Sequence, residues 1–131
     1  MSRENVELMQ RAFDAFNRRD LEAYLALMDD EVESGSRLVA IEGDYRGHDG
    51  VRRWWESLKE TLPNDTVEVA EVRDHGNLTV AALTNSAVGS HSETPVVQRL
   101  WTVAEWREEK VVWWSNYRTE AEALEAVGLR E

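Results

Sequence analysis

Apolar side chains recur three and four residues apart in three segments of the first half of the chain, with charged residues between them. This spacing predicts amphipathic helices over residues 5–18, from residue 21 to the acidic residues 29–31, and over residues 48–62. Asp20 precedes the second helix as an N-cap, and Pro63 stops the third because proline cannot continue a helix. Each helix is expected to bury one face.

After Pro63 the apolar period changes to two. Alternation predicts strands over residues 66–72, 78–88, 96–107 and 110–117, with turns at 74–77 and 108–109 and a polar loop at 89–95. Weaker patterns at 32–36 and 37–41 predict one strand and a candidate second strand before turns at Gly43 and Gly47. We expect an antiparallel sheet throughout. Residues 119–127 predict a short closing helix, capped by Thr119 and ended by Gly128.

Helices followed by long strands predict an α+β layer in which the helices cover one face of a curved sheet and enclose a cavity. The chain has six tryptophans, which suit the wall of a ligand cavity, although a core or a dimer interface would bury them equally well. Trp113 and Trp114 are adjacent on one predicted strand, so they face opposite sides of the sheet. Because the side bearing Trp113 needs a cover, we expect a homodimer through the outer sheet face.

The composition narrows the class of protein and its partners. The 131 residues, 42% of them hydrophobic, suit a single domain over residues 1–131. We expect a cytoplasmic protein, since neither a secretory signal nor a membrane span is visible. There is no cysteine and the three histidines lack ligand spacing, so we expect no metal and no cofactor. A net charge of −11 disfavours nucleic acid and membranes as partners.

Three segments carry a family resemblance. Residues 15–21 (AFNRRDL), 45–51 (YRGHDGV) and 121–129 (AEALEAVGL) resemble SnoaL-like proteins of the nuclear-transport-factor-2-like superfamily. The resemblance implies an α+β cone with three N-terminal helices packed on a curved antiparallel sheet and a short C-terminal helix. These segments are structural signatures, so they indicate the fold and say little about chemistry.

The resemblance allows the superfamily's known mechanisms to be tested. The Asp-Arg-Asp set of limonene-epoxide hydrolases falls on Asn85, Leu83 and Asn116, and the pair that holds the water falls on Ser34 and Ser36. An amide or a leucine has no proton to exchange near neutral pH, so that mechanism is not expected.

Ketosteroid isomerases lead to the same conclusion. Their proton-shuttling Asp corresponds to Ser36, their oxyanion-binding Tyr to Ala12, and their second oxyanion acid falls near Trp101. The acid of SnoaL-type cyclases has no placed equivalent in this chain.

The matched positions predict a largely apolar, amide-rich pocket. By resemblance and strand parity, its ligand-binding residues are Phe13, Phe16, Ser34, Ser36, Trp55, Leu83, Asn85, Gln98, Leu100, Trp114, Asn116 and Arg118. Arg118 is placed at the pocket mouth, where it could bind a carboxylate. Arg99 and Glu105 have the opposite parity and are interpreted as interface residues, and His48 as a residue that caps backbone groups.

Three hypotheses follow. The leading one is a protein that binds a small hydrophobic molecule bearing a hydroxyl or carbonyl group. The alternative is a lyase, isomerase or epoxide-hydrolase-type enzyme of the same superfamily with relocated acid and base residues, which requires an inward Asp, Glu or His. The third is a protein-interaction module that uses the convex sheet face with Trp113 and Arg99.

Overall fold

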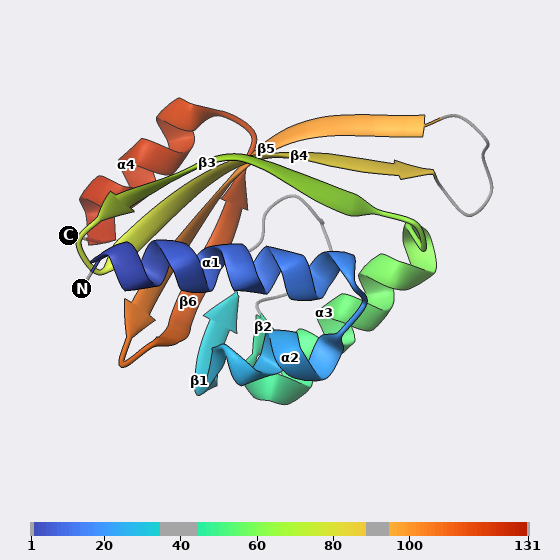
Figure 1. The fold of residues 1–131 in the computed structure, drawn as a ribbon, viewed down its shortest axis with the longest axis horizontal. Coiled ribbons are helices and arrows are strands. Elements are labelled where there is room, and N and C mark those ends of the chain that lie inside the picture. The colour runs from blue at the N-terminus through green and yellow to red at the C-terminus, as the bar shows by residue number, and fades with distance from the viewer. Residues whose placement is uncertain (1, 35–44, 89–94, 131) are drawn as a thin grey trace.

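The computed structural model describes residues 2–34, 45–88 and 95–130. In these residues the chain forms four helices and a curved six-stranded sheet (Figure 1). None of the described helices is long and apolar enough to span a membrane. Ser36, the candidate strand at 37–41, the turn at Gly43 and most of the loop at 89–95 lie outside the described residues.

The predicted helices are present with shifted ends. They are α1 (Ser2–Asn17), α2 (Leu21–Ala26), α3 (Gly47–Thr61) and α4 (Glu120–Arg130). Asp20 caps α2 as predicted, since its carboxylate accepts a hydrogen bond from the amide of Ala23 at 3.1 Å. Two predicted ends are wrong: α2 stops at Ala26 instead of the acidic residues, and α4 continues through Gly128. The first error arises because the carbonyl of Leu27 accepts the amide of Val111, which joins the chain to the sheet.

The strands are β1 (Met28–Ser34), β2 (Tyr45–Arg46), β3 (Thr66–His75), β4 (Leu78–Val88), β5 (Pro95–Arg107) and β6 (Lys110–Tyr117). Their order is β2-β1-β6-β5-β4-β3. The expectation of a sheet antiparallel throughout is wrong, because β1 pairs with β6 in parallel. Apolar alternation reveals a strand without revealing its neighbour, and β1 reaches β6 through a long connection that permits the parallel direction.

Backbone conformation explains two features of the connections. Glu108 and Glu109 both have positive φ, at 51° and 66°, which fits the two-residue hairpin turn between β5 and β6. At Gly50 a β-carbon would lie 3.0 Å from the carbonyl carbon of Tyr45. The close approach of α3 to β2 therefore requires glycine at position 50, within the 45–51 signature.

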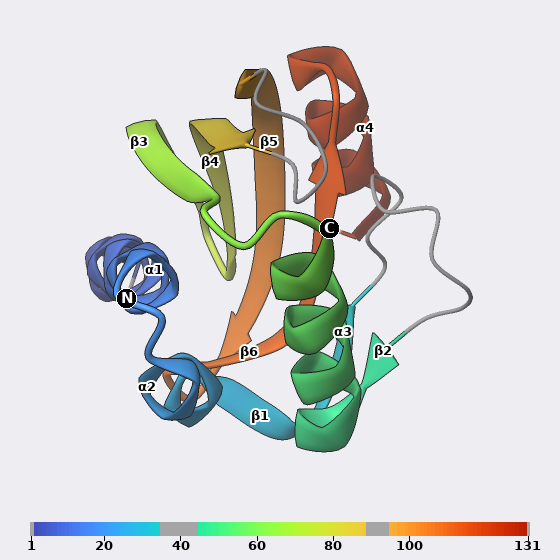
Figure 2. The same ribbon diagram turned by 90° about the vertical axis from the view of Figure 1, so that its right-hand side faces the viewer.

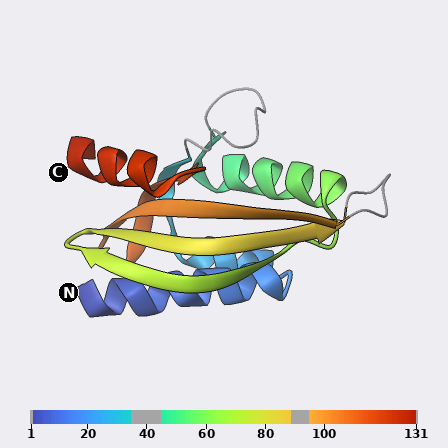
Figure 3. The same ribbon diagram turned by 90° about the horizontal axis from the view of Figure 1, so that it is seen from above.

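The helices occupy both faces of the sheet. Figure 3 shows α1 on one side of the β3–β5 strands and α4 on the other, and Figure 2 shows the bend of the sheet between β3 and β2. The main core lies on the concave side, with buried residues of α1, α2 and α3 packed against the strands. A second cluster lies beneath α4, where Ala123 and Val127 pack against Leu78, Val80 and Val103.

The second cluster changes the argument for a dimer. Trp113 and Trp114 face opposite sides of the sheet as predicted, with Trp114 in the main core and Trp113 packed against the cluster beneath α4. Trp113 is half-buried against this cluster, which includes Ala123 and Val127 of α4, so the chain itself provides part of the cover that was expected from a partner subunit. The homodimer remains a prediction, and it needs support from residues other than Trp113.

Candidate functional site

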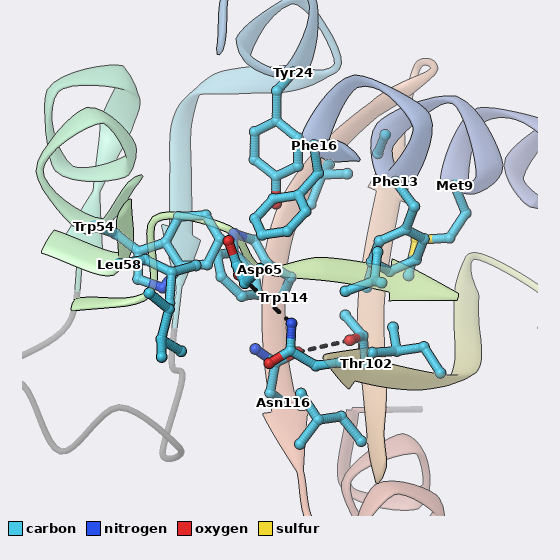
Figure 4. Close-up of a pocket in the computed structure, with 18 of the residues that line it drawn as sticks. Met9, Phe13, Phe16, Tyr24, Trp54, Leu58, Asp65, Thr102, Trp114 and Asn116 are labelled. Atoms are coloured by element: carbon cyan, nitrogen blue, oxygen red, sulfur yellow. Dashed lines mark hydrogen bonds between the residues drawn. The ribbon is translucent and has the colours of Figure 1, made fainter. Parts of the chain in front are cut away.

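A cavity of about 280 Å³ lies between the three N-terminal helices and the concave face of the sheet (Figure 4). Most of its lining is apolar. Buried residues form its inner part, among them Met9, Tyr24 and Val111, while half-buried or exposed residues such as Thr61, Gln98 and Asn116 lie toward the solvent. The space is close to the lower end of the range typical of small-molecule pockets.

Most of the predicted pocket residues do line this cavity. Two come from α1 and the others from β4, β5 and β6: Phe13, Phe16, Leu83, Asn85, Gln98, Leu100, Trp114 and Asn116. For the six strand residues the prediction holds because side chains two residues apart share one face of a strand. The structure places all eight of these residues on the cavity wall.

The remaining predicted residues lie elsewhere. Ser34 is buried at 1% exposure, without a hydrogen-bond partner for its hydroxyl among the described residues, and is not part of the lining. Arg118 is exposed beyond the end of β6 and also lies off the lining. Ser36 lies outside the described residues.

Trp54, rather than Trp55, is the tryptophan of α3 that lines the cavity. Its ring centroid lies 4.8 Å from that of Trp114, edge to face. Trp55 is buried beside the cavity, with its ring 5.3 Å from Phe16 and 5.2 Å from Tyr24. Both tryptophans fall on the apolar side of the helix, so helical spacing could not decide which one faces the cavity.

The lining also contains a carboxylate that the sequence analysis missed. Asp65 is 1% exposed and points into the cavity from the connection between α3 and β3 (Figure 4). An aspartate two residues after Pro63 has the usual appearance of a solvent-exposed turn residue, which is why it was not singled out. The inward acidic residue that the enzyme hypothesis requires is therefore present.

Lys59 compensates the charge of Asp65. Its Nζ lies 2.5 Å from Asp65 Oδ1 and 3.7 Å from the centroid of the Phe16 ring. Its side chain is 17% exposed. Burial lowers the pKa of Lys59, while the hydrogen bond to Asp65 acts in the opposite direction. A buried ion pair of this kind keeps a charged acceptor inside an apolar cavity at the cost of desolvating two ions.

Two amides complete the polar part of the lining. Thr102 Oγ1 donates to Asn116 Oδ1 at 2.6 Å, and Asn85 Nδ2 donates to the carbonyl of Thr66 at 3.1 Å. Asn85 Nδ2 also lies 3.5 Å from Asp65 Oδ2 (Figure 4). These contacts fix the direction of both amides, so each presents a known group to the cavity.

Tyr24 forms part of the buried inner wall. Burial raises the pKa of its hydroxyl well above the ordinary range. The phenol therefore remains protonated at neutral pH and can act as a hydrogen-bond donor.

The other ionisable candidates lie away from the cavity lining. His48 Nε2 is 3.0 Å from the carbonyl oxygen of Met28, which agrees with its interpretation as a residue that binds backbone. Arg99 is exposed, with its guanidinium 5.3 Å from the centroid of Trp101. Within the described parts of the chain, no three His, Cys, Asp or Glu side chains come together as metal ligands.

The fold and the pocket on the concave face of its sheet define an α+β protein of the cone type. A comparison with protein families matches residues 9–114 to the SnoaL-like domain. The chain belongs to this family.

Solved structures support the same fold. An NTF2-like protein of unknown function from Burkholderia pseudomallei has a TM-score of 0.81 at 18% identity, covering 95% of this chain and 97% of that one. A putative SnoaL-like polyketide cyclase from Jannaschia has a TM-score of 0.79 at 17% identity, covering 96% and 92%. TerC, co-crystallised with polyporic acid, has a TM-score of 0.78 at 19% identity, covering 95% and 98%. A comparison with curated proteins found no match.

Proposed function

We propose that this protein binds a small, largely apolar molecule carrying a carbonyl or hydroxyl oxygen. The observation that carries the proposal is the cavity of about 280 Å³, whose apolar wall is interrupted by a few oriented polar groups. That combination is typical of small-molecule sites, where apolar burial supplies affinity and polar groups fix the orientation of the ligand.

Asn116 supplies a donor for a carbonyl group. Because its Oδ1 accepts the hydroxyl hydrogen of Thr102, its Nδ2 group remains for a ligand. Asn116 is half-buried on the lining, so a carbonyl oxygen could reach it from the cavity.

Two of the similar structures are connected by name with small molecules. One of them was crystallised with the organic acid polyporic acid, and another is described as a putative polyketide cyclase. At these identities they share the fold, and the proposal for this chain rests on its own pocket.

Tryptophan fluorescence provides the test, because Trp54 and Trp114 both line the cavity. The protein is titrated with aromatic ketones, steroids and terpenes, and hits are repeated by thermal unfolding. A ligand at one hundred times its dissociation constant adds about 2.7 kcal/mol, which shifts the melting temperature by several degrees.

Two variants of β5 locate the ligand. Leu100→Trp fills the cavity from the sheet and should abolish both signals, whereas Arg99→Trp points outward and should leave them unchanged. Equal binding by the two variants would place the ligand elsewhere and contradict the proposal.

A second candidate function is proton transfer, favoured by the carboxylate of Asp65 inside the pocket. A carboxylate next to a bound ketone could remove a proton from the carbon beside the carbonyl and return it. The test is deuterium incorporation into 2-tetralone in D₂O, followed by NMR. Exchange above the buffer rate that disappears in Asp65→Asn would support the candidate, and exchange at the buffer rate would reject it.

A further inference from the structure

The carboxylate of Asp65 has few hydrogen-bond partners for a buried charge. Its Oδ1 is paired with Lys59 Nζ, and among the described residues its Oδ2 has only the Asn85 amide at 3.5 Å, the long limit of a hydrogen bond. An ionised carboxylate can accept about four hydrogen bonds. Since Asp65 is 1% exposed and lines the cavity, the unused acceptor capacity of Oδ2 is available to a molecule in that cavity.

Asn85 adds a second acceptor beside the first. Its Nδ2 is engaged with the carbonyl of Thr66 and with Asp65, so its Oδ1 is the part of the amide left for other contacts. Asn85 is 9% exposed and belongs to the same lining. We call Asp65 Oδ2 and Asn85 Oδ1 together the acceptor corner. Both residues line the cavity, where a donor carried by a ligand can reach these acceptors.

We propose that the acceptor corner is a subsite for a hydroxyl group carried by the apolar ligand, and that Asp65 thereby selects hydroxylated ligands over their ethers. This inference rests on the proposed binding function and narrows its ligand class. A hydroxyl donates one hydrogen to the carboxylate, whereas an ether oxygen has no hydrogen to donate and would leave Oδ2 with only its long contact to Asn85 among the described residues.

Charge complementarity excludes the two ionic alternatives. A ligand carboxylate at the corner would face Asp65, whose charge already has its partner in Lys59. A ligand ammonium would compete with Lys59 Nζ, which occupies the other oxygen of the same carboxylate and lies over the Phe16 ring. A neutral donor is the group that suits a carboxylate whose charge is already compensated.

Four naphthalenes that differ at one position test the inference by isothermal titration calorimetry. They are 2-naphthol, 2-methoxynaphthalene, 2-naphthoate and 2-naphthylmethylammonium. We expect 2-naphthol to bind about ten- to a hundredfold more tightly than the methyl ether, the range for a hydrogen bond to a buried charged acceptor. Both ions should bind more weakly than 2-naphthol.

A paired substitution tests whether Asp65 causes the preference. Lys59→Gln combined with Asp65→Asn removes both charges at nearly constant size and avoids leaving one ion unpaired. The preference for 2-naphthol over the ether should fall at least tenfold, while affinity for the ether stays within a few fold. The matched control is Glu22→Gln with Arg52→Gln, which removes an exposed ion pair between α2 and α3 and should preserve the preference. Circular dichroism confirms that each variant is folded.

The outcomes separate the inference from the function on which it rests. If 2-naphthol and its ether bind equally and Leu100→Trp blocks both, the pocket binds apolar molecules and the hydroxyl subsite is refuted. Tighter binding of either ion refutes it as well, as does a preference that persists in the paired variant. If none of the four probes binds, the proposed binding function itself is contradicted.

Discussion

At the scale of single residues, the pocket depends on one ion pair between α3 and the chain that follows it. Lys59 and Asp65 are the described ion pair in which both side chains are largely removed from solvent, at 17% and 1% exposure. The exposed pair of Arg52, also on α3, and Glu22 of α2 offers a direct comparison. Removing one partner of a buried ion pair strongly destabilises a fold, whereas an exposed ion pair contributes little to stability. The two pairs should therefore respond differently to substitution.

Lys59→Met should destabilise the fold by about 3 kcal/mol, because it leaves the carboxylate of Asp65 buried without a compensating charge. Urea unfolding followed by tryptophan fluorescence measures the loss. Arg52→Met, the matched control on the exposed pair, should change stability little. Equal effects in the two variants would mean that Asp65 does not need its partner.

Tyr24 predicts a dependence on alkaline pH. Its pKa in the folded protein lies above the ordinary value of 10.0 because burial disfavours the phenolate. The unfolded chain therefore releases this proton before the folded protein does, so stability is lost as pH rises above about 10. Tyr24→Phe should flatten that part of the stability curve in urea unfolding at a series of alkaline pH values. Parallel curves for wild type and variant would contradict the prediction.

At the scale of elements, an amide side chain at the end of α1 binds that helix to the sheet edge. β3 is an edge strand, and Asn17 at the end of α1 bonds both backbone groups of Val67, donating to its carbonyl and accepting from its amide at 2.8 Å each. The side chain thus replaces a neighbouring strand at this point. Because Val67 and α1 both border the cavity, this contact also positions the pocket wall.

Asn17→Ala should cost about 1 kcal/mol through the loss of two partly exposed hydrogen bonds. The amide of Val67 should also exchange with deuterium faster than in the wild type. Arg18→Ala, next to it in sequence and held only by a long exposed contact to Asp20, is the control and should do neither. Unchanged protection at Val67 in Asn17→Ala would show that α1 is held by its apolar contacts alone.

At the scale of the whole molecule, the outer sheet face is covered in part by the chain itself. α4 contributes two residues to the cluster against which Trp113 packs, so the chain itself covers part of this region. The start of β5 is different, because Val97 is 66% exposed and shares the outward parity of Arg99 and Trp101. A homodimer, if formed through this face, would bury Val97.

We expect the protein to sediment as a homodimer, and Val97→Glu to convert it to a monomer by placing a charge in the interface. Val96→Glu is the matched control, since Val96 is also exposed but has the opposite parity on the strand. Sedimentation velocity at several protein concentrations measures both. A monomeric wild type would refute the dimer, and dissociation by both variants would refute this choice of face.

The sequence by itself determined the elements whose cause is local. Alternation between turn residues placed β4 and β6 with the bounds they have, and the cap at Asp20 and the stop at Pro63 placed the ends of two helices. Parity was enough to bring Leu83, Asn85 and Asn116 to one wall, because the alternation of side chains along a strand is a local property.

The tertiary structure decided what depends on distant neighbours. It paired β1 with β6 in parallel and packed α4 on the cluster that Trp113 borders. It also directed Trp54, rather than Trp55, toward the cavity. It also buried Asp65, a residue in a polar connection, by bringing Lys59 and Asn85 against it from two other elements. Burial and charge compensation are properties of the packed chain, so no local pattern of residues could have revealed that the carboxylate of Asp65 lines the pocket.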